Sequence, residues 1–82
     1  VVSYFQCSKE ELYEIPVILD TQKTELKILD DKITGFNIGM NIGDDAGQTI
    51  FHCHIHIIPR RHGDTPNPKG GIRGVIPDKQ SY

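Results

Sequence analysis

The chain has few cysteines and no long apolar run, and each absence narrows what the protein can be. Its two cysteines, Cys7 and Cys53, lie far apart in the sequence and show no CxxC spacing, so no disulfide framework is predicted. We expect two free, buried thiols in a reducing compartment. No apolar stretch reaches the length of a membrane span, and no signal peptide or other targeting sequence is present. The expected location is therefore the cytoplasm.

The chain is also short, and its charge is unevenly distributed. Its 82 residues suffice for one small domain, and a domain of this size usually needs a crosslink, a metal or a partner for stability. The net charge of -2 argues against general binding of nucleic acids. Residues 1–50 hold 4 lysines and 9 acidic residues (net -5), whereas residues 51–82 hold 5 basic and 2 acidic residues (net +3). This asymmetry suits a small anionic ligand and equally fits an ordinary solvated surface.

A capping box predicts where the main helix begins. Ser8 is a good N-cap, and Glu11 follows it three residues later. Apolar residues then recur at helical spacing, namely Leu12, Ile15, Leu19, Leu26 and Leu29. We predict a helix from about Lys9 to about Leu29. Pro16 should kink this helix about one turn upstream, or split it into two short helices.

Two strands are predicted after the helix and a loop over residues 30–35. Apolar and polar residues alternate from Phe36 to Ile42, which is typical of a half-buried strand, and we assign its apolar side chains to the core (Phe36, Ile38, Met40 and Ile42). A second strand is expected from about Thr49 to Ile58, ended by Pro59. Residues 43–48 are rich in turn-forming types, so the two strands are predicted to form an antiparallel hairpin.

The last part of the chain, residues 60–82, is rich in proline and glycine and shows little periodicity. We expect an extension that crosses the surface of a single domain spanning residues 1–82. The predicted fold class is thus α+β, with one long helix packed on an antiparallel sheet. So narrow a sheet is not stable alone, and its free edges favour pairing, so we expect a homodimer.

Three histidines alternate along the second predicted strand. Because side chains alternate between the two faces of a strand, His52, His54 and His56 should project from one face, opposite to Cys53, Ile55 and Ile57. By register, they should share that face with Asn37, Gly39 and Asn41. Crowded imidazoles disfavour one another's protonation, so a purely structural role explains this cluster poorly.

Two kinds of chemistry fit the histidine cluster. Imidazole is the most common metal ligand in proteins, and HxH on a strand is a common zinc arrangement. Neutral imidazole is also a good nucleophile toward phosphorus near pH 7. A zinc site would need a further carboxylate or thiolate on the same face, but Cys53 points to the other face and Asp64 lies well past the strand end. Gly47, Gln48 and Thr49 instead provide a cradle for phosphate oxygens, which favours the nucleophile.

The segment Asn41–Thr49, followed by His52–Arg60, resembles the histidine-triad (HIT) family. The motif of that family is His-x-His-x-His-x-x, where x is apolar, preceded by a glycine-glutamine pair. Residues Tyr4–Glu11 and Gly70–Pro77 also resemble a bacterial subgroup, the diadenosine tetraphosphate hydrolase-like proteins, so the resemblance covers most of the chain.

The resemblance implies a nucleotide hydrolase or transferase that acts on diadenosine polyphosphates or adenosine phosphoramidates. His54 would attack the α-phosphorus and form a nucleotidyl-histidine, which water then hydrolyses. His56 would contact phosphate oxygens, and His52 would orient His54. The predicted substrate-binding residues are Gln48 and Thr49 at the scissile bridging atom, with Gly47 and Asn41 along the phosphate and ribose. No cofactor is implied, although some members act on metal-complexed substrates.

The resemblance also implies that the domain is partial. A complete member of the family has a further N-terminal helix and strands that hold the base and ribose. Two alternatives therefore stay open: a nucleotide-binding module without turnover, and a metal site formed by the three histidines. Arg60 and Arg61 are candidates for attracting a polyphosphate, or are simply the solvated end of the strand.

Overall fold

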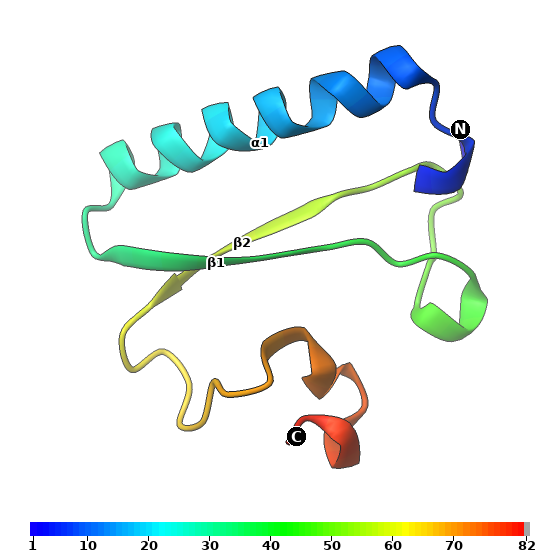
Figure 1. Ribbon diagram of the computed structural model, residues 1–82. Coiled ribbons are helices and arrows are strands. Elements are labelled where there is room, and N and C mark those ends of the chain that lie inside the picture. Colours follow the sequence, from blue (N-terminus) through cyan, green and yellow to red (C-terminus); the bar gives the residue numbers. More distant parts are fainter. Residues whose placement is uncertain (82) are drawn as a thin grey trace.

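A computed structural model describes residues 1–81 and shows a helix and a short tail on opposite sides of a small sheet (Figure 1). The regular elements are α1 (Lys9–Leu29), β1 (Ile33–Gly39) and β2 (His56–Arg61). Short 3₁₀ helices are η1 (Tyr4–Gln6), η2 (Asp44–Ala46), η3 (Gly71–Val75) and η4 (Pro77–Lys79). The two strands pair antiparallel. This arrangement confirms the predicted α+β class.

The helix α1 has the predicted bounds and the predicted cap. The Ser8 hydroxyl accepts a hydrogen bond from the Glu11 backbone N–H (3.1 Å), and the Glu11 carboxylate accepts one from the Ser8 N–H (2.8 Å). These bonds satisfy two of the donors that a helix start leaves unpaired, which fixes the first turn. They also lower the pKa of Glu11. Pro16 lies inside the continuous helix, so the alternative of two short helices is wrong.

The apolar stripe of α1 is only partly covered. Its predicted members are half-buried at Leu12, Ile15, Leu19 and Leu26. Leu29, the last helical residue, is 84% exposed, so the covered part of the stripe ends before it. The stripe faces the sheet from one side and contacts β2.

Both strands overlap their predicted ranges only in part. β1 begins at Ile33 instead of Phe36 and ends at Gly39, opposite His56. The ladder stops there because the chain turns away into a loop in which Gly43 and Gly47 adopt positive φ angles of 90° and 85°. At the other end, Ile33 is buried and pairs with Arg61. The hairpin therefore has a long connection instead of the short turn that the sequence indicated.

Pro59 does not end the second strand. It lies within β2, opposite Phe36. A proline has no N–H to donate to a ladder, but a strand with a neighbour on one side only can turn that position outward. In this two-stranded sheet β2 has such a free edge.

The core is thin. Among the residues that the structure describes, Ile33 is the only buried hydrophobic residue. Of the four side chains assigned to the core face, Phe36 and Met40 are half-buried, but Ile38 and Ile42 are 43% and 37% exposed. One helix on two strands cannot enclose both faces of a sheet, which explains this difference. No helix within residues 1–81 combines the length and apolar character needed to cross a membrane.

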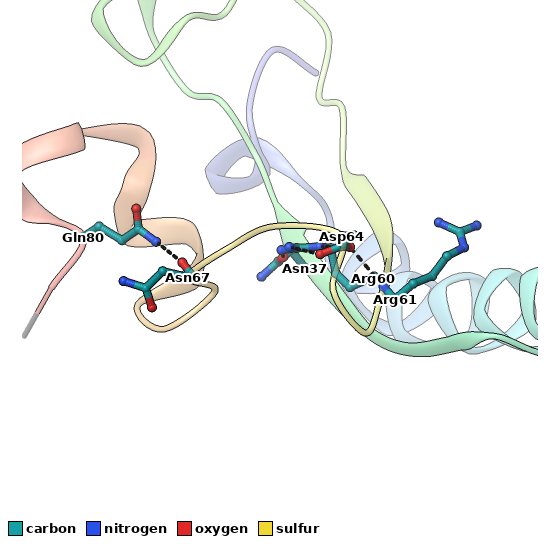
Figure 2. Close-up of polar contacts among 6 residues, drawn as sticks. All are labelled: Asn37, Arg60, Arg61, Asp64, Asn67 and Gln80. Atoms are coloured by element: carbon teal, nitrogen blue, oxygen red, sulfur yellow. Dashed lines mark hydrogen bonds and ion pairs between the residues drawn. The ribbon is translucent and has the colours of Figure 1, made fainter.

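The tail folds back across the face of the sheet opposite to α1 (Figure 1). The side chain of Ile72 in η3 approaches Gly39 of β1, and Gly71 approaches Asn37. The Gln80 side chain closes the tail on itself by donating to the carbonyl oxygens of Asn67 (3.0 Å) and Lys69 (3.2 Å). The contact between Gln80 and Asn67 is drawn in Figure 2.

Candidate active site

The register of the sheet fixes which side the last histidine of the cluster occupies. His56 pairs with Gly39, and Ile58 pairs with Asn37, so these four residues share one face of the sheet. This is the face that carries the tail and lies away from α1. The predicted sharing of a face by His56, Asn37 and Gly39 therefore agrees with the structure.

His52 and His54 lie before β2 and outside the ladder, so the prediction of a strand through them is wrong. Their alternation with the apolar residues is nevertheless kept. All three histidines are exposed, whereas Cys53, Ile55 and Ile57 are half-buried on the side of the helix. An extended backbone alternates its side chains whether or not a neighbouring strand is hydrogen-bonded to it.

All seven predicted site residues line one small pocket of about 90 Å³. The histidine segment supplies His52, His54 and His56, and the preceding loop supplies Asn41, Gly47, Gln48, Thr49 and a further residue, Ile50. Sequence reasoning did not include Ile50. The pocket is open and of a size for a single small polar group, such as a phosphoryl group, and well below the roughly 300–1,000 Å³ typical of pockets that enclose a whole ligand.

Gln48 holds the loop that forms one wall of this pocket. Its side-chain oxygen accepts from the Gly43 N–H (2.8 Å), and its Nε2 donates to the carbonyl oxygens of Val2 (2.9 Å) and Ile50 (3.3 Å). The side chain is only 9% exposed. The amide is therefore engaged by backbone on both its donor and its acceptor side, and it shapes the loop from within.

The loop itself is folded by two glycines. Gly47 closes η2 in the left-handed region, and its N–H donates to the Asp44 carbonyl (2.9 Å). A side chain at Gly47 would approach the amide of Asn41, so glycine also keeps this wall of the pocket clear. The contact of Gly47 with a phosphate stays a prediction.

The three imidazoles make no hydrogen bond to any other group within residues 1–81. They are consequently free to contact a ligand. No hydrogen bond joins His52 to His54, so the proposed orientation of His54 by His52 stays a prediction.

The alternative of a metal site finds no donor set in the part of the chain that the structure describes. No group of three or more His, Cys, Asp or Glu side chains there is placed to hold a metal ion. Asp64, the best candidate for a further ligand, is engaged by Arg60 and by the Arg61 backbone N–H, and these contacts hold the pKa of Asp64 well below its usual range.

Both arginines at the end of β2 have acidic partners. Arg60 binds Asp64, and Arg61 Nε donates to Asp30 Oδ2 (2.7 Å), which lowers the pKa of Asp30. Figure 2 shows the Arg61 side chain directed away from the Arg60–Asp64 pair. These arginines brace the end of the hairpin, and the pocket of the histidines lies at its other end.

Two features near the histidines were missed by sequence reasoning. A largely apolar cavity of about 460 Å³ adjoins the small pocket and shares His56 and Asn41 with it, and the tail residues Ile72, Val75 and Ile76 form its far wall. Cys7 and Cys53, 46 positions apart, lie at one hollow beside His52. Both features depend on long-range folding, for which the sequence carries no local signal.

Comparison with known proteins agrees with the geometry. The HIT domain family model matches residues 4–63. The chain belongs to the HIT domain family. No solved structure matches it significantly.

Several curated proteins are similar over parts of this HIT chain. The bis(5'-nucleosyl)-tetraphosphatase [asymmetrical] of Schizosaccharomyces pombe is 61% identical over 28 residues, which are 34% of this chain and 15% of that protein. Adenylylsulfatase HINT3 of Arabidopsis thaliana is 58% identical over 36 residues, covering 40% and 18%. Protein hit of Bacillus subtilis is 34% identical over 55 residues, covering 67% and 34%. The chain thus spans about a third or less of these relatives.

Proposed function

We propose that the protein is a nucleotidyl hydrolase or transferase that cleaves at the α-phosphate of a dinucleoside polyphosphate or a nucleoside phosphoramidate. The observation that carries the proposal is the common pocket of His52, His54, His56 and the loop residues Asn41, Gly47, Gln48 and Thr49. An exposed, unpaired imidazole between two others, beside a tight glycine loop, suits attack on phosphorus. The names of the relatives, a tetraphosphatase and an adenylylsulfatase, add support from proteins that act on nucleotides.

In the proposed reaction, His54 attacks the α-phosphorus, and the bond from phosphorus to the bridging oxygen or nitrogen breaks. The leaving group departs with the electron pair of that bond and is protonated by solvent. Water then attacks the nucleotidyl-histidine, which releases the nucleoside monophosphate and a proton and restores His54. Two displacements replace one difficult step. In this proposal His56 contacts the phosphate oxygens, and positioning and charge neutralisation lower much of the remaining barrier.

The structure suggests a division of labour within the loop. Thr49 and the backbone at Gly47 would contact the ligand, whereas Gln48 keeps the loop in shape through its three hydrogen bonds. Asn41 lies between the small pocket and the apolar cavity, since it lines both. It is therefore our candidate for contacting the ribose beside the phosphate.

A second candidate function is a nucleotide-binding module without turnover. A pocket of about 90 Å³ holds a phosphoryl group but does not enclose a whole nucleotide, so a bound nucleotide would be held incompletely for the chemical step. In either case we propose that no cofactor is required, that a divalent metal enters only as a complex with the substrate, and that the protein is a cytoplasmic homodimer.

The test measures release of adenosine monophosphate from diadenosine tetraphosphate and from an adenosine phosphoramidate, in excess chelator. The His54→Ala variant should lose at least about 10³-fold of the activity, as expected when a nucleophile is removed. His62→Ala is the matched control, because His62 lies outside the histidine pocket and should keep full activity.

Three other outcomes would contradict the hydrolase. Equal activity of the parent chain and His54→Ala would exclude His54 as nucleophile. Calorimetric binding of the nucleotide without product would support the binding module. A stoichiometric zinc ion that survives the chelator would support the metal site.

A further inference from the structure

Cys7 and Cys53 lie at the same hollow, although 46 positions separate them in the chain. The hollow is open, has a volume of about 330 Å³, and is bordered by the start of α1 on one side and the histidine segment on the other. In Figure 1 the N-terminal segment, in blue, lies beside the segment that leads into β2. Both cysteines are half-buried, and both are free thiols.

Backbone contacts hold the two cysteines in this arrangement. The Cys53 N–H donates to the Val1 carbonyl (2.8 Å), which fastens the histidine segment beside residues 1–7. The Cys7 thiol lies 3.9 Å from the Ser3 carbonyl oxygen, to which it donates. Burial, and next to it the neighbouring Cys53 side chain, raise the pKa of the Cys7 thiol. Each thiol therefore has the other in its immediate surroundings.

We propose that Cys7 and Cys53 form a site of reversible oxidation, joined in a disulfide by exchange with a low-molecular-weight disulfide such as oxidised glutathione. One thiolate attacks the small disulfide, forms a mixed disulfide and releases one glutathione thiol. The second protein thiolate then displaces the other glutathione thiol and closes the Cys7–Cys53 bond. The two protein thiols are oxidised, one small disulfide is reduced to two thiols, and glutathione reverses the reaction.

The places of the two cysteines in the chain support the proposed disulfide as well as their shared hollow. Cys53 lies between His52 and His54, and Cys7 directly precedes Ser8, the N-cap of α1. The bond would fasten the histidine segment to the start of the helix. Because the raised pKa keeps Cys7 protonated near neutral pH, exchange should accelerate as pH rises. A disulfide of this kind in a reducing compartment acts as a redox sensor.

The test equilibrates the 82-residue chain with anaerobic glutathione redox buffers, traps the thiols with acid and alkylates them. Intact-mass measurement should show that neither cysteine is alkylated, that the chain has lost two hydrogen atoms, and that no glutathione is attached to it. Cys7→Ser and Cys53→Ser are the controls, and each should yield a glutathione adduct instead. Glutathione adducts or intermolecular dimers as the products of the parent chain would overturn the proposal.

A second measurement tests whether the fold favours the Cys7–Cys53 bond, or whether the bond forms as readily in an unfolded chain. The equilibrium constant for closing the bond against glutathione is compared in buffer and in concentrated urea. We expect it to be at least about tenfold larger in buffer, because folding raises the effective concentration of one thiol near the other. Equal constants would overturn the proposal. The readout is thiol chemistry, so neither result depends on the proposed nucleotide reaction.

Discussion

Arg60 and Asp64, four residues apart at the end of the hairpin, form a two-pronged ion pair. Arg60 Nε and Nη2 lie 2.8 and 2.7 Å from the two carboxylate oxygens of Asp64 (Figure 2). Arg60 Nη1 also donates to the side-chain oxygen of Asn37, and the Arg61 N–H donates to Asp64 (3.0 Å). One guanidinium thus joins β2, β1 and the turn that begins the tail.

Removing the Asp64 carboxylate should loosen all three segments. We expect Asp64→Ala to lower the melting temperature by about 3–6 °C, because it removes both hydrogen bonds of the ion pair and leaves Arg60 without its acidic partner. Asp78→Ala is the control, because Asp78 is exposed in η4. Circular dichroism melts compare the two. Equal shifts would mean that the pair contributes no more than any surface charge.

Acid should destabilise the fold through the same carboxylates. The pKa values of Asp64, Asp30 and Glu11 are lowered, mainly by hydrogen bonds to Arg60, to Arg61 and to Ser8 respectively. A carboxyl group whose pKa is lower in the folded state stabilises the fold above its unfolded pKa of about 4 and loses that contribution as pH falls further. Stability should therefore be flat from pH 7 to about 5 and fall below about 4.

Urea midpoints across that pH range would measure the effect. The Asp64→Asn variant should show a shallower decline, because it removes the group with the largest shift and leaves the other two. A decline as steep as that of the parent chain would show that Asp64 does not carry the acid dependence.

Local signals in the sequence were sufficient for the helix and for the histidine pattern. Ser8 and Glu11 interact within one turn, so their spacing alone fixed where α1 begins. The alternation of His54 with its neighbours follows from an extended backbone, and it survives although only His56 lies in the ladder. The family motif is likewise local, and it was sufficient to group seven of the eight residues that line the histidine pocket.

Interactions between distant residues were beyond such reasoning. The ends of β1 depend on the pairing of Ile33 with Arg61 and on a loop closed by Gln48, neither of which is a local pattern. Pro59 suggested a strand end because its neighbours in space were unknown. The meeting of Cys7 and Cys53 required the whole hairpin to be placed under α1.

The capping box should carry a measurable share of the helix stability. Ser8→Ala removes the hydroxyl that accepts from Glu11, and we expect a loss of about 1 kcal/mol in the free energy of unfolding. Ser3→Ala is a matched control, because Ser3 precedes η1 without any capping bond from its side chain and should change the value little. Urea denaturation followed by circular dichroism of the helix would compare them, and similar losses would contradict a specific role for the cap.

The folded conformation of the tail should depend on Gly70 more than on Gly63. Both have positive φ angles, 94° and 79°, so an alanine at either position costs about 1–2 kcal/mol of backbone strain. At Gly70 the new Cβ would also overlap the backbone carbonyl of Gln80, whereas at Gly63 it meets nothing within 4 Å. Gly70→Ala should therefore displace Gln80 and make the already exposed Lys79 a faster site of trypsin cleavage. Equal cleavage of both variants would show that Gln80 does not hold the tail.

The last prediction concerns Gln48, whose side chain binds backbone at three points while lining the histidine pocket. Gln48→Ala should lower the free energy of unfolding by about 1–3 kcal/mol, because it leaves the Gly43 N–H and two carbonyls without their partner. Gln22→Ala, at an exposed helical position, is the control and should change stability little.

Hydrogen exchange at the Gly43 amide distinguishes the two roles open to Gln48. A residue that shapes the loop should, when truncated, release the Gly43 amide to exchange faster, in the absence of any ligand. Gln48→Glu should keep that amide protected, because a carboxylate oxygen can accept the same bond, while losing the two donated bonds. If Gln48 instead acted only on the bridging atom of a substrate, Gln48→Ala would reduce turnover and leave Gly43 exchange unchanged.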